Sequence, residues 1–176
     1  MIKFKECKIK DIKESFSSLI GEKYALVTVA DEEKVNMMTA SWGSMGILWN
    51  KNIVNMVIRP SRYTYDFMMK NDYFTLNFLS DGNEEIYKFC GTKSGRDYDK
   101  IAETGLVPVE LKNSAFAFDK SEYVFVCKTL YKQPMNRECF NDADYAEKTY
   151  PTDDIHTMFI AEIEEIYVKD CWIGIF

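Results

Sequence analysis

Apolar residues in this chain gather in short runs that are separated by polar tips and turn-forming residues. Residues 24–30 form an apolar run with high β propensity, residues 31–34 are polar, and residues 35–42 continue as a second extended segment. Two such runs joined by a short polar tip predict a β-hairpin near the start of the chain.

The same pattern predicts further strands and a few short helices. The expected strands cover residues 53–59, 73–80, 115–118, 123–130 and 158–168, and Pro60 ends the first of them. The expected helices cover residues 11–19, 65–70, 83–89 and 98–103, with Thr64 as the N-cap of the second. Residues 141–150 are an acidic, aromatic insertion for which the pattern predicts no structure.

These elements predict a mainly β fold, a β-barrel with short helical insertions. The helices are too short and too irregularly placed for a doubly wound parallel sheet, and the glycine-rich dinucleotide fingerprint is absent. A length of 176 residues without an internal repeat or a linker indicates a single domain over residues 1–176.

Charge and hydropathy exclude several classes of protein. The net charge is −6 and the pI is about 5.0, whereas a nucleic-acid binder carries a basic field. No apolar run approaches the ~20 residues that a membrane span needs. Residues 1–6 alternate in charge and lack the apolar stretch of a secretion signal. We therefore expect a cytoplasmic protein that binds neither nucleic acid nor membrane.

Five cysteines and one histidine limit the metal and redox chemistry of the chain. The cysteine count is odd and no CxxC pair occurs, so we expect reduced, mostly packing cysteines rather than disulfides or a zinc site. His156 is the only histidine, which excludes the HExxH type of zinc centre, and no metal site is predicted. As an acid–base group His156 has no nucleophile partner at a recognisable spacing, so a structural role is the commoner interpretation.

The segment from residue 36 to residue 43 runs from a strand into a loop. Thr39 and Ser41 are two residues apart, so their side chains share one face of a strand, and Asn36 lies on the other face unless a bulge intervenes. Backbone groups at a strand end, beside a residue as small as Ala40, suit the polar edge of a flat ring such as a flavin. Spacing alone favours the plainer alternative, a hairpin strand with hydroxyls at its end.

A second segment, residues 59–64, carries two arginines and two hydroxyls. Arg59 and Arg62 are close in sequence to Ser61 and Thr64, and forked guanidinium groups together with hydroxyls bind phosphate well. If Thr64 caps a helix, free backbone N–H groups add to the same place. A solvated turn with a helix cap is an equally good interpretation.

A third segment, residues 90–100, combines two glycines, two hydroxyls and three basic residues. Such a loop favours anions. It lacks the spacing of a P-loop, and by itself it is typical of a surface turn between two helices.

The ordered set of these segments resembles one protein family. The order is Asn36-x-x-Thr39-Ala40-Ser41-Trp42, then Arg59-Pro60-Ser61-Arg62-Tyr63-Thr64, then residues 74–79, followed by Cys90-Gly91-x-x-Ser94-Gly95-Arg96-Asp97-x-Asp99-Lys100 and residues 156–162. It is similar to the flavin reductase-like family of FMN-binding split barrels, and to its flavoredoxin-type members. The resemblance covers nearly the whole chain, and it implies an antiparallel split β-barrel that forms a homodimer with FMN near the subunit interface.

The resemblance also implies which residues bind the cofactor. The isoalloxazine and ribityl parts would be contacted by Asn36, Thr39, Ala40, Ser41 and Trp42, and the phosphate would be bound by Arg59, Pro60, Ser61, Arg62, Tyr63 and Thr64. The ring would be lined by Asn77, Phe78 and Leu79, and the pocket would be closed by Cys90, Gly91, Lys93 and Ser94. His156 matches a histidine before the last barrel strand, near the nicotinamide site.

Two regions depart from the family pattern or vary within it. Trp49-Asn50-Lys51-Asn52 stands where many relatives have a Pro-Pro pair, so that loop is expected to differ in shape. The insertion at residues 141–150 is expected to cover the flavin or to touch a partner.

The resemblance implies an FMN-dependent oxidoreductase. NAD(P)H would pass a hydride to the flavin, which would pass electrons onward, while the protein binds and orients the cofactor. No side chain is assigned as a catalytic acid or base. The first alternative is a non-enzymatic FMN-containing electron carrier that a redox protein partner reduces. The second is a flavin-free binding or structural barrel.

Overall fold

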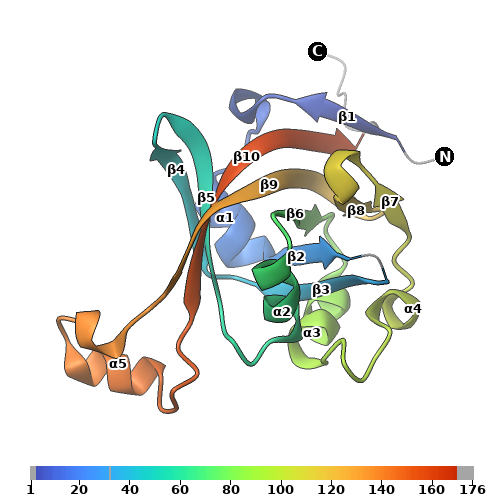
Figure 1. Ribbon diagram of the computed structural model, residues 1–176. Coiled ribbons are helices and arrows are strands. Elements are labelled where there is room, and N and C mark those ends of the chain that lie inside the picture. Colours follow the sequence, from blue (N-terminus) through green and yellow to red (C-terminus); the bar gives the residue numbers. More distant parts are fainter. Residues whose placement is uncertain (1–2, 32, 170–176) are drawn as a thin grey trace.

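The computed structural model describes residues 3–31 and 33–169 of the chain and shows a mainly antiparallel β structure with short helices (Figure 1). Cys171, one of the five cysteines considered above, lies outside the described residues. The main sheet has eight strands in the order β3-β2-β6-β9-β10-β5-β4, with β1 paired to β10. The strands are β1 (Phe4–Cys7), β2 (Ala25–Ala30), β3 (Val35–Ala40), β4 (Gly43–Leu48), β5 (Lys51–Ile58), β6 (Tyr73–Leu79), β9 (Ser121–Pro134) and β10 (Thr157–Lys169).

Two long strands, β9 and β10, form the centre of this sheet and lie side by side over most of their length (Figure 1). The free edge of β9 pairs with β6, whereas β10 pairs with β5 over residues 157–162 and with β1 over residues 166–169. Register shifts between Ile160 and Ala161 and between Ile163 and Glu165 interrupt the β9–β10 ladder. Such bulges bend a strand and increase its twist, which lets one strand serve two neighbours along one edge.

A smaller sheet and five α-helices complete the described part of the chain. The small sheet pairs β7 (Pro108–Glu110) with β8 (Phe116–Phe118). The helices are α1 (Phe16–Ser18), α2 (Tyr63–Lys70), α3 (Glu84–Thr92), α4 (Lys100–Thr104) and α5 (Ala143–Thr149). Within the described residues no helix is both long and apolar enough to cross a membrane.

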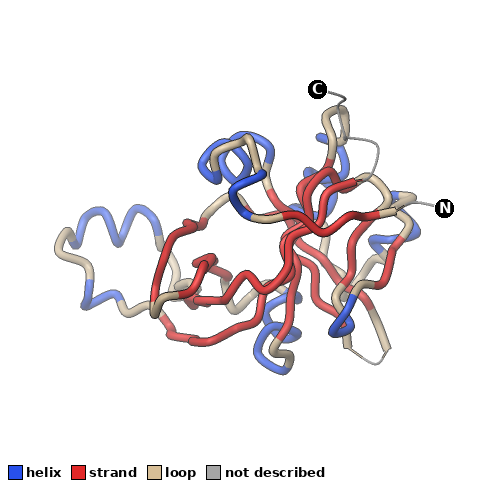
Figure 2. Tube along the Cα trace, turned by 90° about the horizontal axis from the view of Figure 1, so that it is seen from above, coloured by secondary structure: helices blue, strands red, loops and turns tan. Residues whose placement is uncertain are grey.

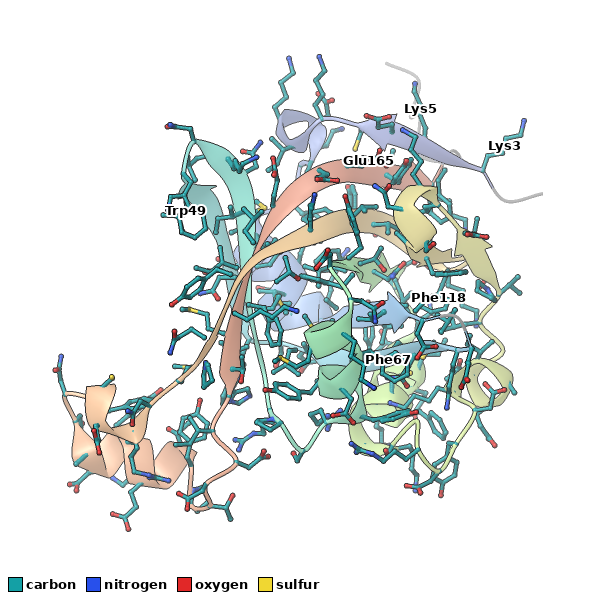
Figure 3. All side chains as sticks on the ribbon, in the orientation of Figure 1. Lys3, Lys5, Trp49, Phe67, Phe118 and Glu165 are labelled. Carbon is teal, nitrogen blue, oxygen red and sulfur yellow. The ribbon has the colours of Figure 1, made fainter. Side chains whose placement is uncertain are left out.

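The core is rich in aromatic rings, which accounts for much of the high aromatic content. Phe78 stands edge-on to Phe125, with ring centroids 5.2 Å apart, and Phe16 meets Phe78 at 6.3 Å. Offset and edge-to-face pairs of this kind add to the free energy gained by burying the rings. Figure 3 shows Phe67 and Phe118 inside the molecule, whereas Trp49 lies at the end of the β4–β5 hairpin.

A buried polar group connects the strands on one side of the core. The Asn77 amide donates hydrogen bonds to Thr28, to Thr75 and to the carbonyl of Phe116, while the Ser121 hydroxyl donates to the Asn77 side-chain oxygen. Both the NH₂ group and the side-chain oxygen of Asn77 therefore have partners inside the protein, as a buried amide requires. The Asn77 and Phe78 side chains both face the interior.

Most of the expected strands and helices are confirmed, and the differences have local causes. Residues 11–19 do not form one helix, because a 3₁₀ turn (Ile9–Asp11), α1 and a π-helical turn (Leu19–Lys23) share this region. The N-cap assignment of Thr64 is wrong: α2 begins at Tyr63, so Thr64 lies inside the helix and its hydroxyl accepts a hydrogen bond from Asn36. The helix expected over residues 98–103 is α4, which begins later than expected, at Lys100, after Asp99 caps it.

Strand β4 was not expected from the sequence. Glycines and Ser44 lower the β propensity of residues 43–46. A Cβ atom on Gly43 would lie 2.8 Å from the Asn55 carbonyl oxygen, so a glycine is needed where β4 meets β5. The connecting residues Trp49 and Asn50 have φ values of 52° and 58°, which is the backbone of a tight two-residue hairpin turn. The loop that departs from the family pattern is therefore this turn.

The insertion at residues 141–150 contains α5, whose first turn Asp142 caps. Its segment connects the far ends of β9 and β10 and stands away from the body of the molecule in both views (Figures 1 and 2). Arg137 ties the segment together by donating to the Tyr150 carbonyl at 2.7 Å.

Candidate functional site

A cavity of about 300 Å³ opens where the end of β3 meets the turn between β5 and α2. It brings together residues from the first two segments identified in the sequence and adds His156 from the start of β10. We call it the arginine cavity, and its lining consists of Met38, Thr39, Ala40, Ser41, Trp42, Val57, Arg59, Arg62 and His156. Its volume is at the lower end of the range found for small-molecule sites.

Arg62 is the most informative side chain of this cavity. Its guanidinium group makes no hydrogen bond, and no ion pair within 4 Å, with any residue in the described part of the chain, although the side chain is half-buried. Burial lowers its pKa, and the charge of Asp154 only partly opposes this effect. A half-buried charge without a partner is unfavourable. The arrangement therefore suits an anion that binds in the cavity.

The neighbouring donors are already engaged by a carboxylate of the chain itself. Asp154 accepts hydrogen bonds from the Ser61 backbone N–H at 3.0 Å and from the Ser61 hydroxyl at 2.5 Å. Arg59 donates to the Asp154 carbonyl at 2.8 Å, and its Nη1 lies 3.9 Å from the Asp154 carboxylate. Asp154 thus occupies the anion position that the sequence suggested for this turn. Of the donors named there, Arg62 is the one that faces the cavity without a partner.

Lys100 adds a buried positive charge next to the site. It is 5% exposed, and its Nζ donates to the carbonyls of Met37 and Cys90 at 2.9 Å each. Burial lowers the pKa of Lys100 to about 8, and the nearby charges of Arg62 and Lys34 act in the same direction. The sequence showed Lys100 only as one of three basic residues in a loop. The sequence signal that distinguishes Lys100 from the other two basic residues is its position directly after Asp99, the N-cap of α4.

Cys90 sits beside this lysine and is fully buried. Burial raises the pKa of its thiol to about 11, so the group stays protonated at neutral pH. A protonated, buried thiol is a poor nucleophile, and Cys90 therefore serves to pack α3 against the sheet.

Asn36, Tyr63 and Thr64 form a support behind the arginine cavity. The Asn36 amide donates to the Thr64 hydroxyl at 2.8 Å, and Asn36 itself is 1% exposed. The loop after α3 closes over it, because a Cβ atom on Gly95 would stand 2.0 Å from the Asn36 side-chain oxygen. Only a glycine permits this approach. These residues hold β3 and α2 together from behind the lining.

His156 is held in place from two sides. Its Nδ1 is hydrogen-bonded to the Tyr150 hydroxyl at 2.9 Å, and its ring centroid lies 5.1 Å from that of Trp42. Burial lowers the pKa of His156 to about 4, and the charge of Arg59 lowers it further than Asp154 raises it. The imidazole is therefore neutral at pH 7. It contributes a flat, polar wall to the cavity and does not act as a charged acid there.

Many residues expected from the resemblance make contacts beyond the arginine cavity or lie outside it. Thr39 donates to the Tyr87 carbonyl at 2.6 Å and also borders a second cavity, together with Leu79 and Gly91. Lys93 stacks over the ring of Tyr98, and Ser94 accepts a hydrogen bond from the Arg96 backbone. The other expected residues lie away from the lining or in the interior: Asn36, Pro60, Ser61, Tyr63, Thr64, Asn77, Phe78 and Cys90.

Comparison with known proteins places the chain in a family. Residues 17–172 match the model of the flavin reductase like domain, so the chain belongs to this family. No curated protein sequence matches the chain. The antiparallel sheet is that of the FMN-binding split-barrel proteins, and the expected fold class is confirmed.

Solved structures with the same fold include three from different organisms. The flavoredoxin of Methanosarcina acetivorans is 18% identical, with a TM-score of 0.69 over 86% of this chain and 71% of its own. An FMN-binding domain of a flavin reductases-like enzyme from Shewanella baltica is 14% identical, with a TM-score of 0.68 over 95% and 78%. The NADH:FAD oxidoreductase of Streptomyces globisporus is 15% identical, with a TM-score of 0.61 over 82% and 74%. At these identities the likeness shows the fold.

The neutral state of His156 leads to the first testable prediction. Because it is the only histidine, its ring signals in an NMR titration can be assigned without ambiguity. We expect no titration between pH 8 and about pH 5.5 and a midpoint near 4, since the folded pKa lies below the ordinary value of 6.5. Between these two pKa values the unfolded chain binds more protons, so this group removes stability as the pH falls. A midpoint near 6.5 would show that the ring is solvated rather than buried.

Proposed function

We propose that this protein is an FMN-binding oxidoreductase whose arginine cavity takes the phosphate end of the cofactor. The observation that carries the proposal is the half-buried guanidinium group of Arg62, which lines the cavity without a partner among the described residues. In a chain of net charge −6, a site with two arginines and a nearby buried lysine is a local exception that favours an anion.

The donor set fits FMN in its chemistry. Arg62 would bind the phosphate in the forked manner that guanidinium groups allow. Thr39, Ala40 and Ser41 would lie along the ribityl chain and the polar edge of the ring, and Trp42 with His156 would provide flat surfaces beside it. When bound, FMN supplies the ability to accept a hydride and to pass electrons on. The chain itself would bind, orient and shield the cofactor.

We propose NAD(P)H as the source of the hydride. Membership of the flavin reductase like family supports this choice, as does the fold shared with an NADH:FAD oxidoreductase. The alternative is an electron carrier that a redox protein partner reduces, and the fold shared with a flavoredoxin supports it. Both functions use the same cavity, so the response to nicotinamide distinguishes them.

A homodimer is part of the same proposal. The arginine cavity is small for a ligand with a ring system, a ribityl chain and a phosphate, so part of the ligand would lie outside it. Large apolar side chains next to the cavity and on the β4–β5 hairpin are exposed: Trp42 is 49%, Ile47 is 70% and Trp49 is 54% exposed. A second copy that covers them would also cover the ligand.

We also propose a cytoplasmic location and a single domain over the chain. The four cysteines in the described part of the structure are free, which suits a reducing compartment.

Removing the Arg62 guanidinium group tests the cofactor proposal. We expect Arg62→Ala to weaken FMN binding by about 1.5–3 kcal/mol, roughly 10- to 150-fold, because a charge-assisted phosphate contact is lost. FMN titration followed by flavin fluorescence measures the effect. Lys112→Ala is the matched control, since Lys112 is paired with Glu165 at 3.0 Å, lines neither cavity, and its loss should change affinity little. Equal affinities of wild type and Arg62→Ala would contradict the proposal.

Anaerobic mixing with NADH and with NADPH separates the reductase from the carrier. If the protein is a reductase, one of the two nicotinamides bleaches the visible absorbance of the bound flavin within the time of manual mixing. Chemical reduction by dithionite serves as the control that the flavin can be reduced at all. A flavin that dithionite bleaches but neither nicotinamide does supports the electron carrier instead.

Sedimentation velocity tests the homodimer. We expect a species of twice the chain mass of 20.6 kDa. Ile47→Glu should shift it to the monomer and weaken FMN binding, because the interface would bury an unpaired charge. Val107→Glu is the matched control, as Val107 is 53% exposed away from the hairpin. A wild-type protein that remains a monomer at micromolar concentration would rule the dimer out.

A further inference from the structure

A second cavity of about 480 Å³ lies on the other side of Thr39 from the arginine cavity. We call it the tyrosine cavity, because Tyr24 and Tyr87 form two of its sides. Thr39 lines both cavities, so a ligand in one would adjoin a ligand in the other. None of the residues proposed to hold the phosphate takes part in this second cavity.

Tyr87 is a fixed wall of the tyrosine cavity. Its hydroxyl accepts a hydrogen bond from the Leu79 backbone N–H at 2.6 Å, and the side chain is 6% exposed. Its backbone carbonyl accepts from Thr39, which links this wall to the arginine cavity. Gly91, one turn further along α3, also lines the cavity, and a Cβ atom there would lie 3.4 Å from the Thr39 Cβ.

Tyr24 is held against Tyr87 by an unusual backbone. Its backbone angles are φ 65° and ψ 163°, a conformation that residues other than glycine rarely adopt. Its ring stands edge-on to Tyr87 with centroids 6.1 Å apart, and 42% of the residue is exposed. Residues held in such conformations concentrate at ligand-binding positions, because a costly backbone persists where the side chain it presents is used. Here that side chain is an aromatic ring at the mouth of a cavity.

The charges around this cavity differ in sign from those of the arginine cavity. Three carboxylates line it, those of Glu22, Asp81 and Glu84, and two lysines accompany them. Lys23 is engaged by Glu14 at 3.1 Å and by Asp81 and Glu122 at 3.6 Å each. Lys88 pairs with Glu85 at 3.6 Å. Three carboxylates against two lysines leave the lining with a net charge of −1, which disfavours anions.

We propose that the tyrosine cavity binds a neutral, planar aromatic compound as the second substrate of the bound flavin. The aromatic walls suit a flat ring, the acidic rim disfavours phosphates and carboxylates, and Thr39 brings the ligand beside the flavin. A naphthoquinone, which keeps a fused aromatic ring, is a member of this class: it would take up two electrons and two protons to become the hydroquinone, and reduced FMN would supply both and be oxidised. The assignment of this substrate to a flavin rests on the proposed function.

Calorimetric titration of the FMN-loaded full chain with two matched probes tests this assignment. The probes are 2-naphthol, which is neutral, and naphthalene-2-sulfonate, which has the same ring and a negative charge. We expect 2-naphthol to bind at least tenfold more tightly than the sulfonate. Glu84→Gln should improve sulfonate binding by about threefold, because a carboxylate of the lining without a lysine partner among the described residues is removed. Equal binding of the two probes, or no binding of 2-naphthol, would overturn the proposal.

Tyr24→Gly separates a ligand-binding role from a structural one. Glycine adopts φ 65° without strain, so the melting temperature should not fall, whereas 2-naphthol binding should weaken at least tenfold. Tyr98→Gly is the matched control, because Tyr98 is 38% exposed in a loop outside the cavity and should keep wild-type affinity. Wild-type affinity in Tyr24→Gly would show that the ring does not contact the ligand.

The two proposals can fail separately. Arg62→Ala should lose FMN affinity and keep 2-naphthol affinity, since Arg62 does not line the tyrosine cavity. A wild-type protein that binds FMN but not 2-naphthol overturns the second-substrate assignment alone. A wild-type protein that binds 2-naphthol but not FMN supports the binding of aromatic compounds in the tyrosine cavity and contradicts the proposed FMN-dependent function.

Discussion

The pairing of β9 with β10 is the constraint on which the rest of the structure depends. β6, β5 and β1 each attach to one of these two strands, and the remaining strands of the sheet follow from β5 and β6. The register of β10 against β5 sets Thr157 opposite Ile58. The residues next to this pair, His156 and Arg59, are thereby brought to the same edge. The lining of the arginine cavity is thus a consequence of strand register, and a slip by one residue would turn its side chains to the other face.

Electrostatics distinguish the two cavities that meet at Thr39. On one side Asp154 already satisfies Ser61 and Arg59, which leaves Arg62 as the cationic group open to a ligand. On the other side, carboxylates line the cavity and its lysines are paired. Under the proposals above, this separation would direct the anionic cofactor to the arginine cavity, because the carboxylates of the tyrosine cavity disfavour an anion there.

The family is shown by the match over residues 17–172, whereas the chemistry rests on particular side chains. Solved structures at 14–18% identity share the fold and include both a flavoredoxin and an NADH:FAD oxidoreductase. One fold therefore carries more than one kind of flavin chemistry, and the choice depends on what reaches the cofactor. In this chain, Trp42, Tyr24 and the exposed β4–β5 hairpin lie where they would govern access to the proposed cofactor site.

The sequence by itself determined the fold class and most of the strands, because strand periodicity is a local property. The resemblance to the family, and not the spacing of the residues, implied that residues 39–42 meet Arg59 and Arg62. The sequence did not reveal β4, whose Gly43 is explained by close contact with β5, nor the interior positions of Asn77 and Phe78. Tertiary structure alone decided that Asp154 fills the anion position at Ser61, that Lys100 is buried and that Tyr24 faces Tyr87. Each of these contacts joins residues far apart in the chain, and their energies depend on burial and distance, which no spacing in the sequence encodes.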